Sequence, residues 1–365
     1  MNRRNTVAAV VVAVALFAAA GVYITRTAGQ ANDTIDTRSD QAAADLAGRY
    51  PEPDRAGPLR ALEPGEIMFV NRAPGDTYGQ IGTLTGNGRT IHGLACNRAY
   101  TAGDTLTCHR PATGLPAIAG RGQAEVTTYR ITGNEPELLT TSDFGIASRA
   151  RVSPDGTLAA STVFVRGHSY TDPGEFSTAT TITEIDADGT TTSANLEDSY
   201  GNNPNGPGTI AALGGNYWGV TFAADNDTFY ATLGIDDHVQ LVQGRVSDRS
   251  IVTFAEGYGC PSLSPDGATI VAKTADGDHL NLVAIDTATL EARPLTGETR
   301  SVEDHVEWLD NDTILYALPR DGETDTDPQP IYDIWSLDLT AGAEPRLYAP
   351  YASSPAAHHS PAGAA

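Results

Sequence analysis

Short apolar runs separated by turn-forming residues fill most of this chain. Between about residues 58 and 351, runs rich in Val, Ile, Thr, Leu and Phe alternate with turns of Gly, Asp, Asn and Pro. Such runs predict β-strands, and such turns predict hairpins, because Asp-Gly and Asn-Asp tolerate the backbone conformations of tight turns. The body of the chain is therefore predicted to be all-β.

The hairpins recur at a regular spacing. Turn positions 65, 104, 156, 227, 267 and 312 are separated by 39 to 52 residues, apart from one interval of 71. A second hairpin follows each turn, built on strand-like runs at residues 81–84, 126–131, 180–185, 240–246, 280–285 and 332–337. Two hairpins make four antiparallel strands, so the spacing predicts a six-bladed β-propeller of four-stranded antiparallel blades over residues 58–351. Two stacked sandwiches, the rival all-β arrangement, would not explain paired hairpins at blade spacing.

The N-terminus predicts export. Val7–Ile24 is an unbroken run of 18 apolar or small residues that follows Arg3 and Arg4. This pattern is typical of a signal anchor or a signal peptide, with the basic end left in the cytoplasm. Residues 1–24 are therefore expected to be a transmembrane or signal helix. The protein is either single-pass in the cell membrane with its C-terminal domain extracytoplasmic, or secreted if the signal is cleaved.

Two further segments lack the strand pattern. Residues 25–57 are polar and acidic, which favours a flexible linker with a brief helix over residues 41–47. Residues 352–365 are rich in Pro, Ala, Ser and His, which predicts a disordered tail. Within that tail, His358 and His359 are expected to be solvated.

The cysteines agree with export. Cys96 and Cys108 lie 12 residues apart around a turn-rich segment, and an oxidising compartment permits a disulfide between them. We favour this pairing over one that involves Cys260, which is expected to be a small buried residue.

Charge narrows the class of partner. The chain carries 46 acidic and 23 basic residues, a formal net charge of −23, and Lys273 is its only lysine. Nucleic acid is excluded as a main partner because phosphate contacts need a basic face.

Two motifs connect the repeat to a known family. The segments at residues 151–159 and 261–271 both contain Ser-Pro-Asp-Gly, and residues 331–338 read Ile-Tyr-Asp-Ile-Trp-Ser-Leu-Asp. They resemble the repeats of TolB-like β-propellers, a kind of WD40-like repeat. The resemblance implies the propeller and covers about four fifths of the chain. TolB also carries an N-terminal α/β domain, and residues 25–57 are too few and too polar to form one. The resemblance is therefore closer to membrane-anchored TolB-like propellers of bacterial envelopes.

No catalytic motif is apparent in the sequence. Gly-x-Ser-x-Gly, His-Glu-x-x-His and zinc-spaced Cys/His clusters do not occur, and we expect neither enzyme activity nor a cofactor or metal. The best candidate site is the mouth of the central channel, where the innermost strand of each blade begins. Counting back about seven residues from the turns gives the candidate ligand contacts Asn97, Arg149, Trp218, Tyr258 and His305.

Two functions are compatible with this mouth. A mixed, aromatic-rich mouth suits capture of a peptide segment or an envelope protein, so we expect a noncatalytic protein- or ligand-binding module, monomeric, in the cell envelope. The alternative is a lactonase-like metal-dependent hydrolase, in which Glu303, Asp304 and Asn97 hold a metal in the channel.

Overall fold

A computed structural model describes residues 34–50, 55–86, 88–112, 122–132, 135–170, 176–200, 210–236, 238–323, 327 and 329–359. The predicted N-terminal segment, residues 1–24, lies outside this part of the chain. Among the described residues, no helix combines the length and the apolar character needed to cross a membrane.

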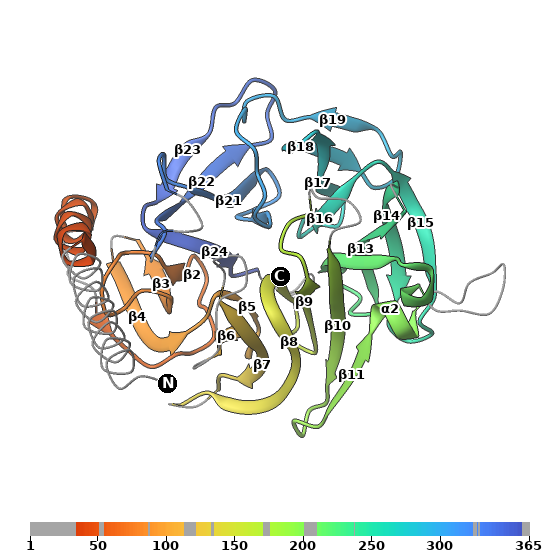
Figure 1. Ribbon diagram of the computed structural model, residues 1–365, viewed down its shortest axis with the longest axis horizontal. Helices are drawn as coiled ribbons and strands as arrows, with labels where there is room; N and C mark the ends of the chain where they lie inside the picture. Colours follow the sequence, from red (N-terminus) through yellow and green to blue (C-terminus); the bar gives the residue numbers. More distant parts are fainter. Residues whose placement is uncertain are drawn as a thin grey trace, which may run out of the picture.

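The described strands form mostly antiparallel sheets arranged around a central axis, as predicted for an all-β propeller (Figure 1). Three of the sheets have four strands each. They consist of β12 (Asn216–Phe222), β13 (Thr228–Ile235), β14 (His238–Arg245) and β15 (Ile251–Glu256); of β16 (Gly259–Leu263), β17 (Thr269–Asp276), β18 (His279–Asp286) and β19 (Ala292–Pro294); and of β20 (Glu307–Trp308), β21 (Thr313–Pro319), β22 (Tyr332–Asp338) and β23 (Arg346–Ala349).

A fourth sheet has seven strands because one long strand belongs to two neighbouring units. Residues 137–146 of β8 pair with β7, and residues 146–152 pair with β9. The sheet contains β5 (Arg98–Ala102), β6 (Thr105–Pro111), β7 (Gln123–Arg130), β8 (Glu137–Val152), β9 (Leu158–Arg166), β10 (Ser177–Ile185) and β11 (Thr191–Asn195). Two short helical turns, α2 (Leu196–Ser199) and η1 (Ala211–Leu213), lie between β11 and β12.

The last described strand closes the ring. β24 (Ala352–Ala357) pairs antiparallel with β2 (Ile67–Asn71), in a sheet that continues through β3 (Gln80–Thr85) and β4 (Gly88–Ala95) to β1 (Arg55–Ala56). The strands nearest the axis then follow one another in the order β24, β5, β8, β12, β16 and β20. All six residues of β24 are buried. The prediction of a disordered tail was therefore wrong for residues 352–357, and residues 360–365 lie outside the described part.

The segment before the ring is also packed, where a flexible linker was predicted. Residues 34–49 are helical, and Ala42 and Leu46 contact the propeller core beside Ile331 and Tyr351. Arg49 donates to the carbonyl oxygens of residues 347 and 348, at 3.2 and 2.6 Å. The short helix expected over residues 41–47 is thus part of a longer one, and tertiary contacts rather than local propensity hold it in place.

The Ser-Pro-Asp-Gly motifs form one repeated turn, which explains why they recur. In the first, the carboxylate of Asp155 accepts from Ser153 Oγ at 2.8 Å and from the Thr157 amide at 3.0 Å, while Ser153 Oγ accepts from the Leu158 amide at 2.9 Å. The second repeats these contacts with Ser264 and Asp266. The residue after each aspartate, Gly156 or Gly267, has a φ of 81° or 73°. These values lie in the left-handed region, which favours glycine.

The predicted disulfide is confirmed. Cys96 and Cys108 form a disulfide, and Cys260 is a free, buried cysteine. The bond joins the segment between β4 and β5 to β6, so it ties the start of an axial strand to the neighbouring strand of its own sheet.

Candidate functional site at the two ends of the central channel

The strands nearest the axis all run in the same direction, so the channel has two distinct ends. We call the end where these strands begin the closed end, and the end where they finish the open end. The predicted mouth residues lie at the closed end, and three of them are almost fully buried: Arg149 is 6% exposed, Trp218 3% and His305 7%.

Arg149 and His305 are brought together by the segment that precedes β20. Arg149 Nη2 donates to the carbonyl oxygen of Glu303 at 2.5 Å, and Lys273 Nζ donates to the same oxygen at 2.8 Å. His305 Nε2 lies 3.2 Å from the carbonyl oxygen of Pro355 on β24. Side chains from several sheets therefore converge on the axis and fill it.

Trp218 reaches the same group through an aromatic stack. Its ring stacks on the Tyr170 ring at a centroid distance of 4.9 Å. The Arg149 guanidinium lies 5.1 Å from the centroid of the same Tyr170 ring. Phe176 packs edge-on against both Tyr170 and Trp218. The stack encloses Arg149 in an apolar setting, which strengthens its few polar contacts.

The remaining predicted residues lie further apart. Asn97 is joined to the closed end through its carbonyl oxygen, which accepts from Arg72 Nη2 at 2.7 Å. Tyr258 packs with Phe254 and Leu263 against a different part of the core. The structure thus brings Arg149, Trp218 and His305 together, joins Asn97 to them indirectly and leaves Tyr258 apart. Their role as ligand contacts stays a prediction.

Trp218 also borders a cavity of about 460 Å³ that is lined by residues of β10, β12, β13 and β14. Glu197 lines the same cavity, and its carboxylate accepts from the Thr180 and Tyr217 amides at 3.0 and 3.1 Å. Burial raises the pKa of Glu197 to about 7, because the charged form is poorly solvated there.

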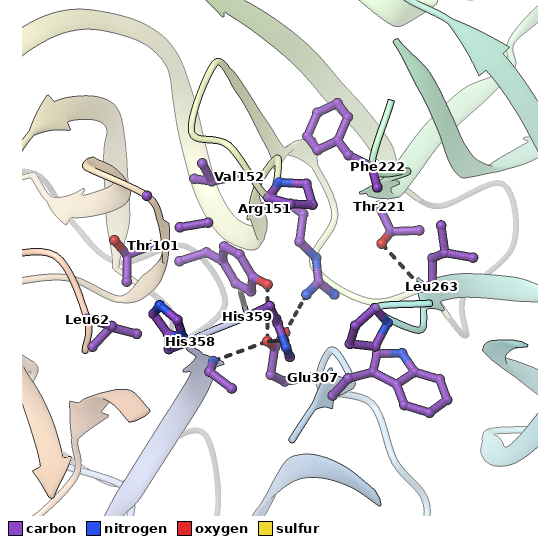
Figure 2. Close-up of a pocket in the computed structure, with 18 of the residues that line it drawn as sticks. Leu62, Thr101, Arg151, Val152, Thr221, Phe222, Leu263, Glu307, His358 and His359 are labelled. Carbon is purple, nitrogen blue, oxygen red and sulfur yellow. Dashed lines mark hydrogen bonds and ion pairs between the residues drawn. The ribbon is translucent and has the colours of Figure 1, made fainter. Parts of the chain in front are cut away.

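The open end holds a cavity of about 520 Å³ on the axis itself. It lies where the axial strands finish, and Figure 2 shows its lining residues converging from several sheets. One part of the wall is apolar and includes Leu62, Val152, Phe222, Leu263 and Trp308. A cavity of this size with a few convergent polar groups is the usual form of a binding site.

Glu307 is the charged centre of this cavity. Its side chain is 1% exposed and accepts from Arg151 Nη1 at 2.5 Å, from the Tyr100 hydroxyl at 3.1 Å and from the Ala357 amide at 3.1 Å. Burial raises the pKa of Glu307, but His359 and Arg151 outweigh it and hold the pKa below its ordinary value. The carboxylate is therefore charged, and its donors fix its position.

The end of the described chain lies inside this cavity. His358 and His359 both line it, and His359 Nε2 is 3.1 Å from Glu307 Oε1 (Figure 2). The expectation that both histidines are merely solvated was wrong for His359. Both histidines lie near the axis because they directly follow β24, the strand that completes the ring.

Sequence reasoning missed this end of the channel, although a signal for it exists. It considered only the residues at which the axial strands begin. Val152 and Leu263 stand immediately before the two Ser-Pro-Asp-Gly turns, where the axial strands finish. Counting toward the turns rather than away from them would have identified the lining residues. Glu307 has no such marker, because its blade lacks the motif.

The residues proposed for a channel metal do not make a good donor set. The carboxylate of Asp304 is paired with Arg98, and Lys273 donates to the Asp304 carbonyl oxygen. Cations in these positions repel a divalent metal. Within the described ranges, no three His, Cys, Asp or Glu side chains are grouped so that they could hold a metal ion.

Comparison with solved structures supports the fold. TolB from Acinetobacter baumannii matches with a TM-score of 0.54 at 14% identity, over 80% of this chain and 66% of that protein. A putative TolB from Agrobacterium tumefaciens matches with a TM-score of 0.45 at 13% identity, over 79% of this chain and 90% of that one. A chain of a nidogen/laminin complex matches with a TM-score of 0.48 at 14% identity, over 80% and 97% of the two chains.

Searches of protein-family models and of curated proteins found no match. The structural likeness confirms the resemblance to TolB-like β-propellers at the level of the fold, and the chain spans about two thirds of the Acinetobacter protein's length.

Proposed function

We propose that this protein is an exported, membrane-tethered TolB-like propeller that binds a protein or peptide segment of the bacterial cell envelope without catalysis. The binding site is the cavity at the open end. The observation that carries this proposal is the shape and chemistry of that cavity: about 520 Å³ on the axis, an apolar wall, and one buried carboxylate, Glu307, fixed by its donors.

The ring has six blades in this proposal. β8 is shared by two blades, so the seven-stranded sheet counts as two, and β24 supplies the axial strand of the first blade. This assignment places an axial strand from every blade around the open end, namely β24, β5, β8, β12, β16 and β20. A ring closed in this way is a rigid frame for a binding site, because neighbouring blades cover each other's faces.

Tethering is supported by the sequence at residues 1–24 and by the packed helix that follows. Helix 34–49 is bound to the propeller by ion pairs and apolar contacts, including Arg38 Nη2 to Glu323 Oε2 at 2.6 Å. An anchor placed before such a helix would hold the propeller close to the membrane. The disulfide between Cys96 and Cys108 is compatible with an extracytoplasmic location.

Photo-crosslinking in cells tests the proposal. A benzophenone amino acid replaces the half-buried Leu263 in the full-length protein, and crosslinked partners are identified by mass spectrometry. The matched control carries the same probe at Val252, which is 59% exposed on the outer strand β15. We expect one envelope protein to be captured from position 263 and absent from position 252.

Three results would count against the proposal. Equal capture at both positions, or none at position 263, removes the open end as the binding site. Capture from position 263 that is lost after alanine replacement of Arg149 and His305, in a protein that remains folded, would move the site to the predicted mouth. Metal-dependent hydrolysis of a lactone by the purified protein would replace the binding module with the enzyme.

A further inference from the structure

The closed end contains more buried positive than buried negative charge. We call Arg149 and Lys273 the axial cation pair. Both are at least nine-tenths buried, at 6% and 3% exposure, and both donate to the same oxygen, the carbonyl of Glu303. Two like charges that share one neutral acceptor repel each other, and burial removes the water that would screen them.

Their other partners are neutral as well. Lys273 Nζ donates to the carbonyl oxygen of Asp304, and Arg149 Nη1 donates to that of Ser148 at 3.2 Å. Cys260 Sγ lies 3.9 Å from Arg149 Nη2. Arg149 Nε is buried and has no hydrogen-bond partner among the described residues, although a guanidinium donor in such a place normally has one.

The acidic groups nearby are partly engaged or exposed. Asp304 Oδ1 is paired with Arg98 and lies 3.6 Å from His305 Nδ1, while Asp304 Oδ2 is buried without a hydrogen-bond partner among the described residues. The Glu303 side chain is exposed. The Glu307 carboxylate forms an ion pair with Arg151 at the other end of the channel. His109 adds no charge, because burial and Arg98 lower its pKa to about 3.

We propose that the axial cation pair binds a small monovalent anion, with chloride as the physiological occupant. Arg149 contacts Cys260 and the Tyr170 ring and shares its carbonyl acceptor with Lys273, so an anion bound beside Arg149 has to be compact. A bound anion would supply the missing charge and a partner for Arg149 Nε. It would also link β8 and β17 to the segment before β20, and so hold neighbouring parts of the ring together. This site does not depend on the function proposed for the open end.

Thermal unfolding in chloride tests the site. Sodium chloride replaces sodium gluconate from 0 to 200 mM at constant ionic strength and pH 7, where Lys273 is charged because its pKa is lowered by burial only to about 8. A binder of the native state raises the melting temperature by mass action, and we expect a rise of about 2–4 °C. Lys273→Met should abolish the rise. Arg110→Gln, which removes an exposed cation paired with Glu125, should retain it.

Two outcomes would overturn the proposal. The first is a melting temperature of the unaltered protein that does not respond to chloride. The second comes from crystals of the unaltered protein grown in bromide, which need no variant to fold. We expect an anomalous peak within hydrogen-bonding distance of Arg149 and Lys273, and an empty map at that position excludes the site.

Discussion

The two ends of the channel are built from the same strands but balance their charges differently. At the open end, one carboxylate, Glu307, is surrounded by donors, and a cavity of about 520 Å³ remains beside it. At the closed end, Arg149 and Lys273 share a carbonyl oxygen, and an aromatic stack covers Arg149. Direction along the strand thus separates an end with an axial cavity from an end that side chains fill. A propeller can change one end without rebuilding the other, because each end uses different positions of the same strands.

The largest expected effect comes from removing the buried carboxylate at each end. Glu307→Ala leaves Arg151 buried without a counterion, and we expect a loss of about 3–5 kcal/mol in the free energy of unfolding. Asp304→Ala should cost less, about 1–3 kcal/mol, because its partner Arg98 is 20% exposed and can be solvated. Urea denaturation of both variants measures the difference. A larger loss in Asp304→Ala would contradict this view of the two ends.

The disulfide should matter next, because it secures the strand that begins at the closed end. Replacing Cys96 and Cys108 by Ser frees a loop of 12 residues, and we expect a loss of about 2–3 kcal/mol in unfolding free energy. Equilibrium denaturation without reductant gives the value. Cys260→Ser is the matched control, since it leaves the bond intact. A double variant as stable as the unaltered protein would show that the ring needs no covalent support there.

The lowered pKa of Lys273 predicts that the free energy of unfolding depends on pH through a group at the closed end. Burial lowers its pKa from 10.5 to about 8, so between these values the unfolded chain keeps a proton that the folded protein has released. Unfolding free energy should therefore rise with pH from about 8 to 10, by at most about 1.4 kcal/mol per unit. Denaturation at fixed chloride, compared with Lys273→Met, isolates the effect. An equal slope in the variant would assign the rise to another group.

The smallest effect is expected from the histidine in the open cavity. His359→Ala removes one of several donors to Glu307, and Arg151, Tyr100 and the Ala357 amide remain. We expect a loss of about 0.5–1 kcal/mol. The melting temperature at pH 7 provides the measurement. A loss of stability as large as that of Glu307→Ala would mean that the contact of His359 with Glu307 is needed to keep the ring closed.

The strands and turns of the ring could be predicted because their causes are local. Asp155 and Asp266 build the same side-chain-capped turn wherever Ser-Pro-Asp-Gly occurs, and the alternating runs that follow match β10 and β18 closely. The disulfide was predictable for the same reason, since Cys96 and Cys108 are close in the chain. The residues of the candidate mouth could be located by counting from the repeated turns. The sequence does not show at which end of the channel side chains fill the axis.

Ring closure and the content of the channel depend on the tertiary structure. Ala352–Ala357 is Ala-Ser-Ser-Pro-Ala-Ala, which resembles a disordered tail, yet it is a buried strand because β2 supplies its hydrogen bonds and the crowded axis favours small side chains. Ala42 and Leu46 become core residues only because the finished ring offers them a surface. The sequence by itself determined the repeating unit, through turns and alternation that act within a few residues. The tertiary structure decided that Glu307 meets Arg151 at one end of the channel and that Arg149 meets Lys273 at the other. The two residues of each pair lie on different sheets, and only the closed ring brings them to one axis.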